Sequence, residues 1–193
     1  MILCGDYDVV DIMFKEINGD LFACPTSYSL AHCISCDAVM SKGIAIDFVR
    51  KFPTIAQLRS SGNQLGSAIP IFVDGRFIYS LITKKRFYDR PVVSTLKHTL
   101  QSMLWHALEN GVINIAMPKI ASGCDKLNFE LVVKPLIISV FNNTRINIFV
   151  HHLDYLQHGY ALETCTYLLL YKDEQFMKII LYRSTSTGPG LIV

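Results

Sequence analysis

Hydrophobic and polar positions in the first third of the chain change from strand-like alternation to helical spacing. Residues 9–17 alternate loosely and predict a strand that Gly19-Asp20 ends, and residues 29–35 predict a second, buried strand. Between residues 44 and 52 the apolar side chains share one face at i, i+4 and i+8 spacing, which predicts a helix. Pro53 is expected to end that helix, because a proline restricts the residue before it.

An Asp-Gly pair at positions 74 and 75 separates two apolar segments, residues 68–73 and 76–83. Both residues can adopt positive φ, so the pair predicts a two-residue β-hairpin. Pro70 lacks a backbone N–H and fits only an edge strand or the start of a strand.

The middle of the chain continues with alternating helices and strands. Residues 91–110 predict a helix, with Pro91 in its first turn and Gly111 just beyond its end. Its apolar stripe consists of Leu96, Leu100, Met103, Leu104 and Ala107. Residues 112–117 predict a strand.

A third helix is predicted over residues 128–141, with Asn128 as its N-cap and Pro135 as the point where it kinks or splits. Residues 145–150 predict the next strand. The order ββ-α-ββ-α-β-α-β predicts an α/β fold, with a mixed or largely parallel sheet and helices on both faces.

The last 41 residues break this alternation, so we expect a domain over residues 1–152 and an extension over 153–193. Residues 166–171 and 176–182 predict a β-hairpin. The Ser, Thr, Gly and Pro residues at positions 184–190 predict a flexible tail.

Composition narrows the class of protein. The 193 residues are 51% hydrophobic and 18% charged, which is typical of a globular domain, and the net charge of +2 gives no electrostatic basis for nucleic-acid binding. No segment reaches the roughly 18–20 apolar residues of a membrane span. The N-terminus lacks the pattern of a secretory signal, so we expect a cytoplasmic or nuclear location. We also expect a monomer.

Six scattered cysteines fit free thiols in a reducing compartment: Cys4, Cys24, Cys33, Cys36, Cys124 and Cys165. Cys33 and Cys36 form a C-x-x-C pair, and its functional interpretation is a redox or zinc site. A zinc site would need a second pair at similar spacing, and a redox pair would begin a helix. We therefore interpret both as small side chains of a buried strand.

Three glycine-containing or polar segments follow predicted strands: residues 18–21, 36–43 and 121–125. In layered α/β sheets, ligands bind beyond the carboxyl ends of strands, and N–H groups at a helix start favour phosphate. Two such loops facing one crevice indicate a diphosphate site. Tight turns are the simpler alternative for each loop taken alone.

Six segments between residues 17 and 150 indicate a particular protein family, because they match it in the same order along the chain. They are Gly-Asp-Leu-Phe-Ala-Cys-Pro at 19–25, Ser-Leu-Ala-His-Cys-Ile-Ser at 29–35, Gly-Ile-Ala at 43–45, Tyr-Ser-Leu-Ile-Thr-Lys-Lys-Arg at 79–86, Asn-Gly-Val at 110–112, and Met-Pro-Lys-Ile at 117–120 with Gly123 and Asp125. Together they resemble the macro domain family, and most closely its branch of terminal ADP-ribose protein glycohydrolases, also described as O-acetyl-ADP-ribose deacetylases.

The resemblance implies a three-layer α/β/α fold with a mixed sheet, and an ADP-ribose site. Asp20 and the backbone at Leu21 would hold adenine, and two loops would enclose the diphosphate and distal ribose. The implied ligand-binding residues are Asp20, Leu21, Ser35, Met40, Lys42, Gly43, Ile44, Lys119, Ile120, Ala121, Ser122, Gly123, Cys124 and His152.

The resemblance also implies the chemistry. Lys84 would attack C1″ of the ring-opened distal ribose and displace a glutamate or aspartate carboxylate, and Asp125 would move protons. O-acetyl-ADP-ribose would be a second substrate. A lysine acts as a nucleophile only while some of it is neutral, and burial favours the neutral form. No metal or other cofactor is needed, and the partners would be ADP-ribose and ADP-ribosylated proteins, with no membrane or nucleic acid.

The chain departs from the family at its phosphate loops. Ser41 and Ala121 stand where the family has glycine, and Cys124 stands where it has an aliphatic residue. Alanine at a positive φ would be strained. Three other functions stay open: a non-catalytic reader of ADP-ribose, an ADP-ribose 1″-phosphate phosphatase, and a structural protein that docks through its C-terminal hairpin.

Overall fold

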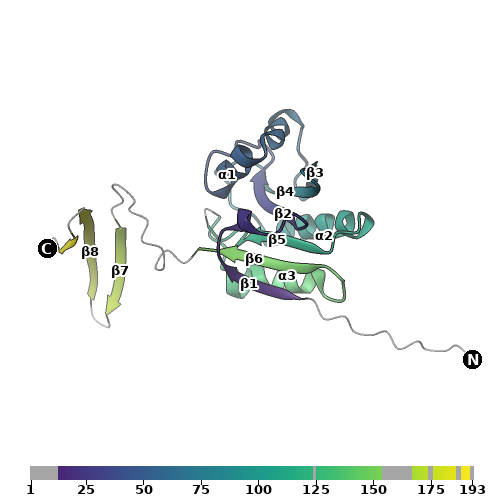
Figure 1. Ribbon diagram of the computed structural model, residues 1–193. Coiled ribbons are helices and arrows are strands. Elements are labelled where there is room, and N and C mark those ends of the chain that lie inside the picture. The colour runs from purple at the N-terminus through teal and green to yellow at the C-terminus, as the bar shows by residue number, and fades with distance from the viewer. Residues whose placement is uncertain (1–12, 124, 154–166, 174–175, 186–187, 192–193) are drawn as a thin grey trace, which may run out of the picture. The chain divides into compact units, whose positions relative to one another are not determined.

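A six-stranded mixed sheet forms the centre of the first of two compact units, Met1–Leu153 and Asp154–Val193 (Figure 1). The computed structural model describes residues 13–123, 125–153, 167–173, 176–185 and 188–191. The strands of this sheet are β1 (Phe14–Asn18), β2 (Ser29–Ser35), β3 (Ala68–Val73), β4 (Arg76–Lys84), β5 (Asn114–Pro118) and β6 (Asn147–His152). Their order is β1-β6-β5-β2-β4-β3, and every pairing is parallel except that of β3 with β4.

Helical segments connect these strands. They are the 3-10 turns η1 (Leu21–Ala23) and η2 (Pro53–Ser60), the α-helices α1 (Ile44–Lys51), α2 (Val93–Glu109) and α3 (Lys134–Phe141), and the π-helical turn η3 (Phe129–Val133).

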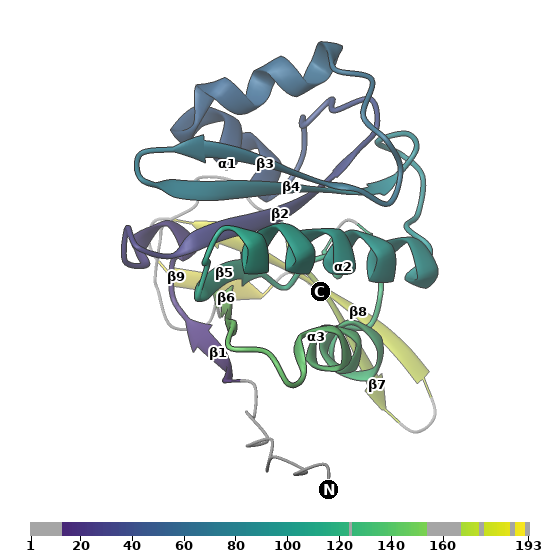
Figure 2. The same cartoon turned by 90° about the vertical axis from the view of Figure 1, so that its right-hand side faces the viewer.

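Side-chain alternation along the buried strands divides the core into two layers. On β4, Tyr79 and Leu81 pack with α2 and α3, whereas Ile78 and Ile82 pack with α1 and the two 3-10 turns. Successive residues of a strand point to opposite faces, so a strand buried on both faces must be apolar at nearly every position. The result is the expected three-layer α/β/α arrangement, with α2 and α3 together on one face (Figure 2).

Local sequence signals set the main turns as predicted. Asp74 and Gly75 have φ of 51° and 79° and join β3 to β4, and β3 is an edge strand that accommodates Pro70. The Asn128 side chain accepts a hydrogen bond from the Leu131 N–H, and the helix changes from π to α beside Pro135.

Several element boundaries differ from the prediction. The strands predicted over residues 112–117 and 145–150 are observed as Asn114–Pro118 and Asn147–His152. Val92, in an extended conformation, is the N-cap of α2, so Pro91 precedes the helix and does not lie in its first turn. The strand predicted over residues 9–17 is observed as Phe14–Asn18, and residues 9–12 lie outside the described part of the chain.

The second unit contains a three-stranded antiparallel sheet in the order β7-β8-β9. Its strands are β7 (Tyr167–Asp173), β8 (Phe176–Thr185) and β9 (Gly188–Leu191). The first two form the hairpin that the sequence suggests. We expected residues 184–190 in a flexible tail. Residues 184–185 instead end β8, and residues 188–190 belong to β9, which pairs with it. Across the described parts of both units, we find no helix of sufficient length and apolar character to cross a membrane.

A histidine lies fully buried inside the first unit. The ring of His32 on β2 stacks on Phe48 of α1 at a centroid distance of 4.0 Å, and its Nε2 lies 3.1 Å from the Ser80 hydroxyl. Burial lowers the pKa of His32 from its ordinary 6.5 to about 3. The folded protein therefore keeps this imidazole neutral.

Acid should destabilise the fold through His32. Below pH 6.5 the unfolded chain binds a proton at this ring, and the folded chain does not until the pH approaches 3, so the free energy of unfolding falls as the pH falls. Between about pH 6 and pH 4 this should cost about 2 kcal/mol. The difference should appear as a steeper decline for the wild type than for His32→Gln in urea unfolding. Carboxylates titrate alike in both proteins, so parallel profiles would contradict this role of His32.

Candidate active site

The carboxyl ends of three neighbouring strands, β5, β2 and β4, surround a pocket of about 290 Å³. The strands are parallel, so the loops that follow them emerge at the same edge of the sheet. Ten of the predicted catalytic and ligand-binding residues line this pocket: Ser35, Met40, Lys42, Ile44, Lys84, Lys119, Ile120, Ala121, Gly123 and Asp125.

Lys84 and Asp125 form an ion pair within this pocket. Lys84 Nζ lies 2.6 Å from Asp125 Oδ1, and the two side chains are only 12% and 9% exposed. Lys84 ends β4, where its carbonyl accepts a hydrogen bond from the Cys36 N–H at 2.9 Å. The backbone that carries the amine is therefore fixed by the neighbouring strand. A lysine and a carboxylate in such contact can exchange a proton directly.

The C-x-x-C residues lie beside this pair but lack the properties of a redox site. Burial, together with the nearby Asp125 carboxylate, raises the pKa of Cys33 to about 12. Burial also raises the pKa of Cys36. Redox-active cysteines need a low pKa, because the thiolate is the reactive form. Cys33 and Cys36 are free thiols, and no three His, Cys, Asp or Glu side chains gather into a metal-holding group within the described residues.

The loops around the pocket have a strained backbone. Ala38, Met40 and Ala121 have φ of 43°, 46° and 55°, in the left-handed region that favours glycine. Such conformations persist where the surrounding structure enforces them, and they concentrate at ligand sites. The family has glycine at the position of Ala121, and Ala121 does have the positive φ that a glycine there suggests.

Backbone N–H groups at the start of α1 can receive an anion. Gly43 is the N-cap of α1 with φ of 58°, and it has no side chain to bond the first N–H groups of the helix. The exposed Lys42 adds a positive charge beside them. A helix start of this kind favours a phosphate group.

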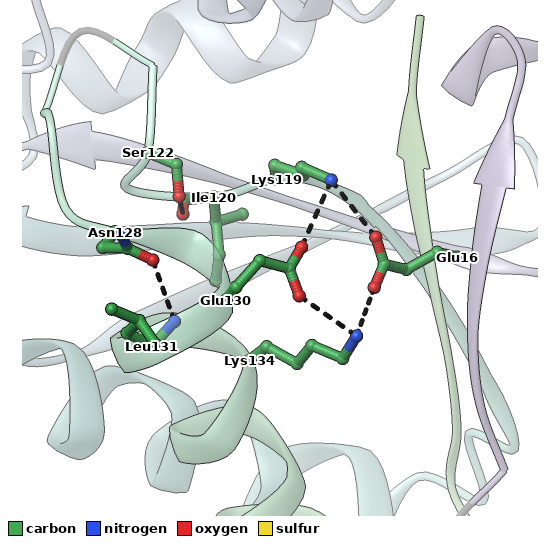
Figure 3. Close-up of polar contacts among 8 residues, drawn as sticks. All are labelled: Glu16, Lys119, Ile120, Ser122, Asn128, Glu130, Leu131 and Lys134. Carbon is green, nitrogen blue, oxygen red and sulfur yellow. Dashed lines mark hydrogen bonds and ion pairs between the residues drawn. The ribbon is translucent and has the colours of Figure 1, made fainter. Parts of the chain in front are cut away.

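Lys119 belongs both to the pocket and to a network of four charged residues (Figure 3). Lys119 Nζ lies 3.2 Å from a Glu16 oxygen and 3.5 Å from a Glu130 oxygen, and Lys134 Nζ contacts the same carboxylates at 2.6 and 3.2 Å. Hydrogen bonds from Lys134, and then from Lys119, lower the pKa of Glu16. The same two carboxylates raise the pKa of Lys134. The network ties the loop after β5 to β1 and to the start of α3.

Six predicted ligand residues are not among the described residues that line the pocket: Asp20, Leu21, Gly43, Ser122, Cys124 and His152. Asp20 is exposed, and its side chain accepts a hydrogen bond from the Phe22 N–H. Leu21 is buried in the core, and the Ser122 hydroxyl donates to the Ile120 carbonyl.

His152 ends β6, and its carbonyl accepts a hydrogen bond from the Gly19 N–H at 2.8 Å. This bond brings the ends of β1 and β6 together next to Asp20. Gly43 caps α1, as described above, and Cys124 lies outside the described residues.

Sequence reasoning missed a chain of contacts on the Lys84 side of the pocket. Asp37 accepts hydrogen bonds from the Ser35 hydroxyl and from the Phe87 N–H, and Phe87 lines the pocket. The only signal was position, because Phe87 closely follows Lys84 and Asp37 closely follows Ser35.

Solved structures with a similar fold include macrodomains. Those of Mycobacterium tuberculosis and Thermus aquaticus DarG match with TM-scores of 0.66 and 0.65, each at 22% identity, and they cover 74% and 72% of this chain and 99% and 98% of theirs. Thermosipho africanus DarTG in complex with ADP-ribose matches with a TM-score of 0.63 at 16% identity, over 76% of this chain and 43% of that one.

Sequence comparison gives nearer relatives, although no family model matches the chain. The chain is 44% identical to the ADP-ribose glycohydrolase OARD1 of Homo sapiens over 137 residues, which are 71% of this chain and 90% of the relative. Identity to OARD1 of Bos taurus is 43% over the same shares. With the macrodomain architecture, this similarity shows that the chain belongs to the macro domain family, in the branch of the ADP-ribose glycohydrolases, which are hydrolases.

Proposed function

We propose that this protein releases mono-ADP-ribose from glutamate and aspartate side chains, and that it also deacylates O-acetyl-ADP-ribose. The observation that carries the proposal is the buried contact of 2.6 Å between Lys84 Nζ and Asp125 Oδ1 in a pocket at the carboxyl ends of β2, β4 and β5. The relatives named as ADP-ribose glycohydrolases and the related fold solved with ADP-ribose support the choice of ligand.

The proposed reaction uses Lys84 as the nucleophile. The neutral amine bonds to C1″ of the ring-opened distal ribose, the bond from C1″ to the ester oxygen breaks, and the carboxylate leaves. Water then releases ADP-ribose and restores the lysine. Asp125, within hydrogen-bond reach of the amine, takes the proton that Lys84 loses and returns one when the adduct is hydrolysed.

The diphosphate would lie between the start of α1 and the loop after β5. Uncapped N–H groups at Gly43, the ammonium of Lys42 and the backbone at Gly123 support this position. The reaction needs no metal or cofactor. The free thiols of Cys24, Cys33 and Cys36 fit a reducing compartment, and we place the activity in the cytoplasm or the nucleus.

Removing either member of the pair should abolish release without abolishing binding. Lys84→Ala and Asp125→Ala should each lower the rate of ADP-ribose release from a glutamate-ADP-ribosylated protein by at least about a thousandfold, because nucleophile and proton carrier act as one unit. Binding of free ADP-ribose, measured by calorimetry, should stay within about tenfold of the wild type.

Lys97→Ala is the matched control, since Lys97 is an exposed lysine of α2 that does not line the pocket, and the substitution should leave release unchanged. If the wild type binds ADP-ribose but releases nothing, the protein is a reader and the proposal is wrong. Release of inorganic phosphate from ADP-ribose 1″-phosphate, with no release from the ester, would instead indicate a phosphatase.

The strained loop gives a second prediction. Replacing Ala121 by glycine should raise the free energy of unfolding by about 0.5–1 kcal/mol. The left-handed conformation costs an L-residue about 1–2 kcal/mol, and glycine removes this cost. Part of the gain is offset because glycine loses more backbone entropy on folding than alanine. Urea unfolding measures the change. Ala116→Gly, at a buried position of β5 with ordinary φ, should destabilise the fold, and a loss of stability in both variants would contradict the strain at Ala121.

A further inference from the structure

The loop after the proposed nucleophile carries two exposed aromatic side chains, Phe87 and Tyr88, and the first of them lines the pocket. Phe87 is 42% exposed, and Tyr88 is 62% exposed. Their rings meet edge to face at a centroid distance of 5.1 Å. Two adjacent exposed aromatic rings leave apolar surface in water, and surface of this kind beside a site marks contact with a ligand or partner.

Hydrogen bonds hold this loop in one conformation. The Phe87 N–H donates to Asp37 at 3.1 Å, and Asp37 is held in turn by the Ser35 hydroxyl. The Arg86 N–H donates to the Asp89 carboxylate at 2.9 Å, and the Asp89 N–H donates back to the Arg86 carbonyl at 3.0 Å. The backbone that carries the two rings is therefore ordered before a ligand arrives, which lowers the entropy lost on binding.

The same loop is basic. Lys85, Arg86 and Arg90 are exposed, and the carboxylate of Asp89 is engaged by the loop backbone. The Arg86 guanidinium lies 5.8 Å from the centre of the Tyr88 ring and donates to its hydroxyl at 2.6 Å. The loop of residues 85–90, here called the rim, thus combines aromatic surface with positive charge. This pattern complements an acidic polypeptide that carries an apolar side chain.

The position of Lys84 decides which part of a substrate reaches this rim. C1″ must come within bonding distance of Lys84 Nζ, so the bond to the leaving carboxylate lies at that end of the pocket, and Phe87 lines the same pocket from the loop that follows Lys84. The polypeptide that bears the ester must leave the pocket there. ADP-ribose itself would extend from there toward the start of α1, the proposed position of the diphosphate.

We propose that Phe87 and Tyr88 determine specificity for the polypeptide around the modified residue. They contact an apolar side chain next to the ADP-ribosylated acid, and Lys85, Arg86 and Arg90 attract the acidic residues around it. This inference rests on the proposed hydrolase function. It predicts that the rings matter for a protein-linked ester and not for a small acyl group or for ADP-ribose alone.

The test compares two substrates in the full chain. One is an acidic peptide with a single ADP-ribosylated glutamate beside a leucine, and the other is O-acetyl-ADP-ribose. The double variant Phe87→Ala/Tyr88→Ala should lose about tenfold in kcat/KM on the peptide, a typical loss for aromatic contacts in an interface. Its kcat/KM on O-acetyl-ADP-ribose and its Kd for ADP-ribose should stay within about twofold of the wild type.

The control is Phe72→Ala, which removes an aromatic ring of β3 that is 63% exposed. This ring packs on Phe77, which lies near the opposite end of β4 from Lys84. It should leave both substrates unaffected. Equal losses on both substrates, or weaker binding of ADP-ribose, would assign the rings to the ribose and overturn the inference, as would no loss on the peptide.

A binding measurement separates this inference from the proposed function. If the wild type hydrolyses neither substrate, the hydrolase proposal fails. The affinity for the ADP-ribosylated peptide is then measured in Lys84→Ala with and without the two ring substitutions. A weaker affinity for the peptide with unchanged affinity for ADP-ribose supports the contact, and equal peptide affinities overturn it.

Discussion

Parallel pairing of β2 with β4 and β5 is the constraint on which the site depends. It brings the ends of the three strands to one edge of the sheet, so that Ser35, Lys84 and Lys119 approach one pocket from distant parts of the chain. Parallel strands need long crossovers between them, and here α1 and α2 provide these while covering opposite faces. The double-sided core and the pocket are thus two consequences of one topology.

The Lys84–Asp125 pair contributes little to the stability of that core. Withdrawing an ammonium and a carboxylate from water costs several kcal/mol per ion, which their attraction only roughly offsets. The pair lies in the pocket at the carboxyl ends of three strands, between loops that are strained at Met40 and Ala121. A catalytic role explains this position better than a role in stability. The network of Glu16, Lys119, Glu130 and Lys134 stiffens the loop that carries Asp125, and it is partly exposed, so each of its ion pairs adds at most about 1 kcal/mol.

Sequence predicted the elements whose cause is local. The Asp74-Gly75 hairpin, the cap at Asn128 and the break near Pro135 follow from the conformations that single residues allow. Lys84 and Asp125 could not be found this way, because a lysine beside Lys85 and Arg86 looks like any surface lysine, and only the resemblance to a family singled it out.

Contacts between distant segments were beyond prediction. Glu16 and Lys134 meet across most of the chain, and the anchoring of Phe87 by Asp37 depends on the pairing of β2 with β4. β9 was missed because its Gly-Pro-Gly sequence is typical of turns, whereas pairing with β8 overrides that preference.

Covalent trapping tests the central claim most directly. The protein is incubated with a glutamate-ADP-ribosylated peptide, reduced with borohydride during turnover, digested and examined by mass spectrometry. A lysine that bonds to C1″ should retain a reduced ADP-ribosyl group on Lys84, and Lys84→Ala should retain none. Turnover without an adduct on Lys84, or an adduct on Lys85 or Lys119 in its place, would contradict the assignment of Lys84 as the nucleophile.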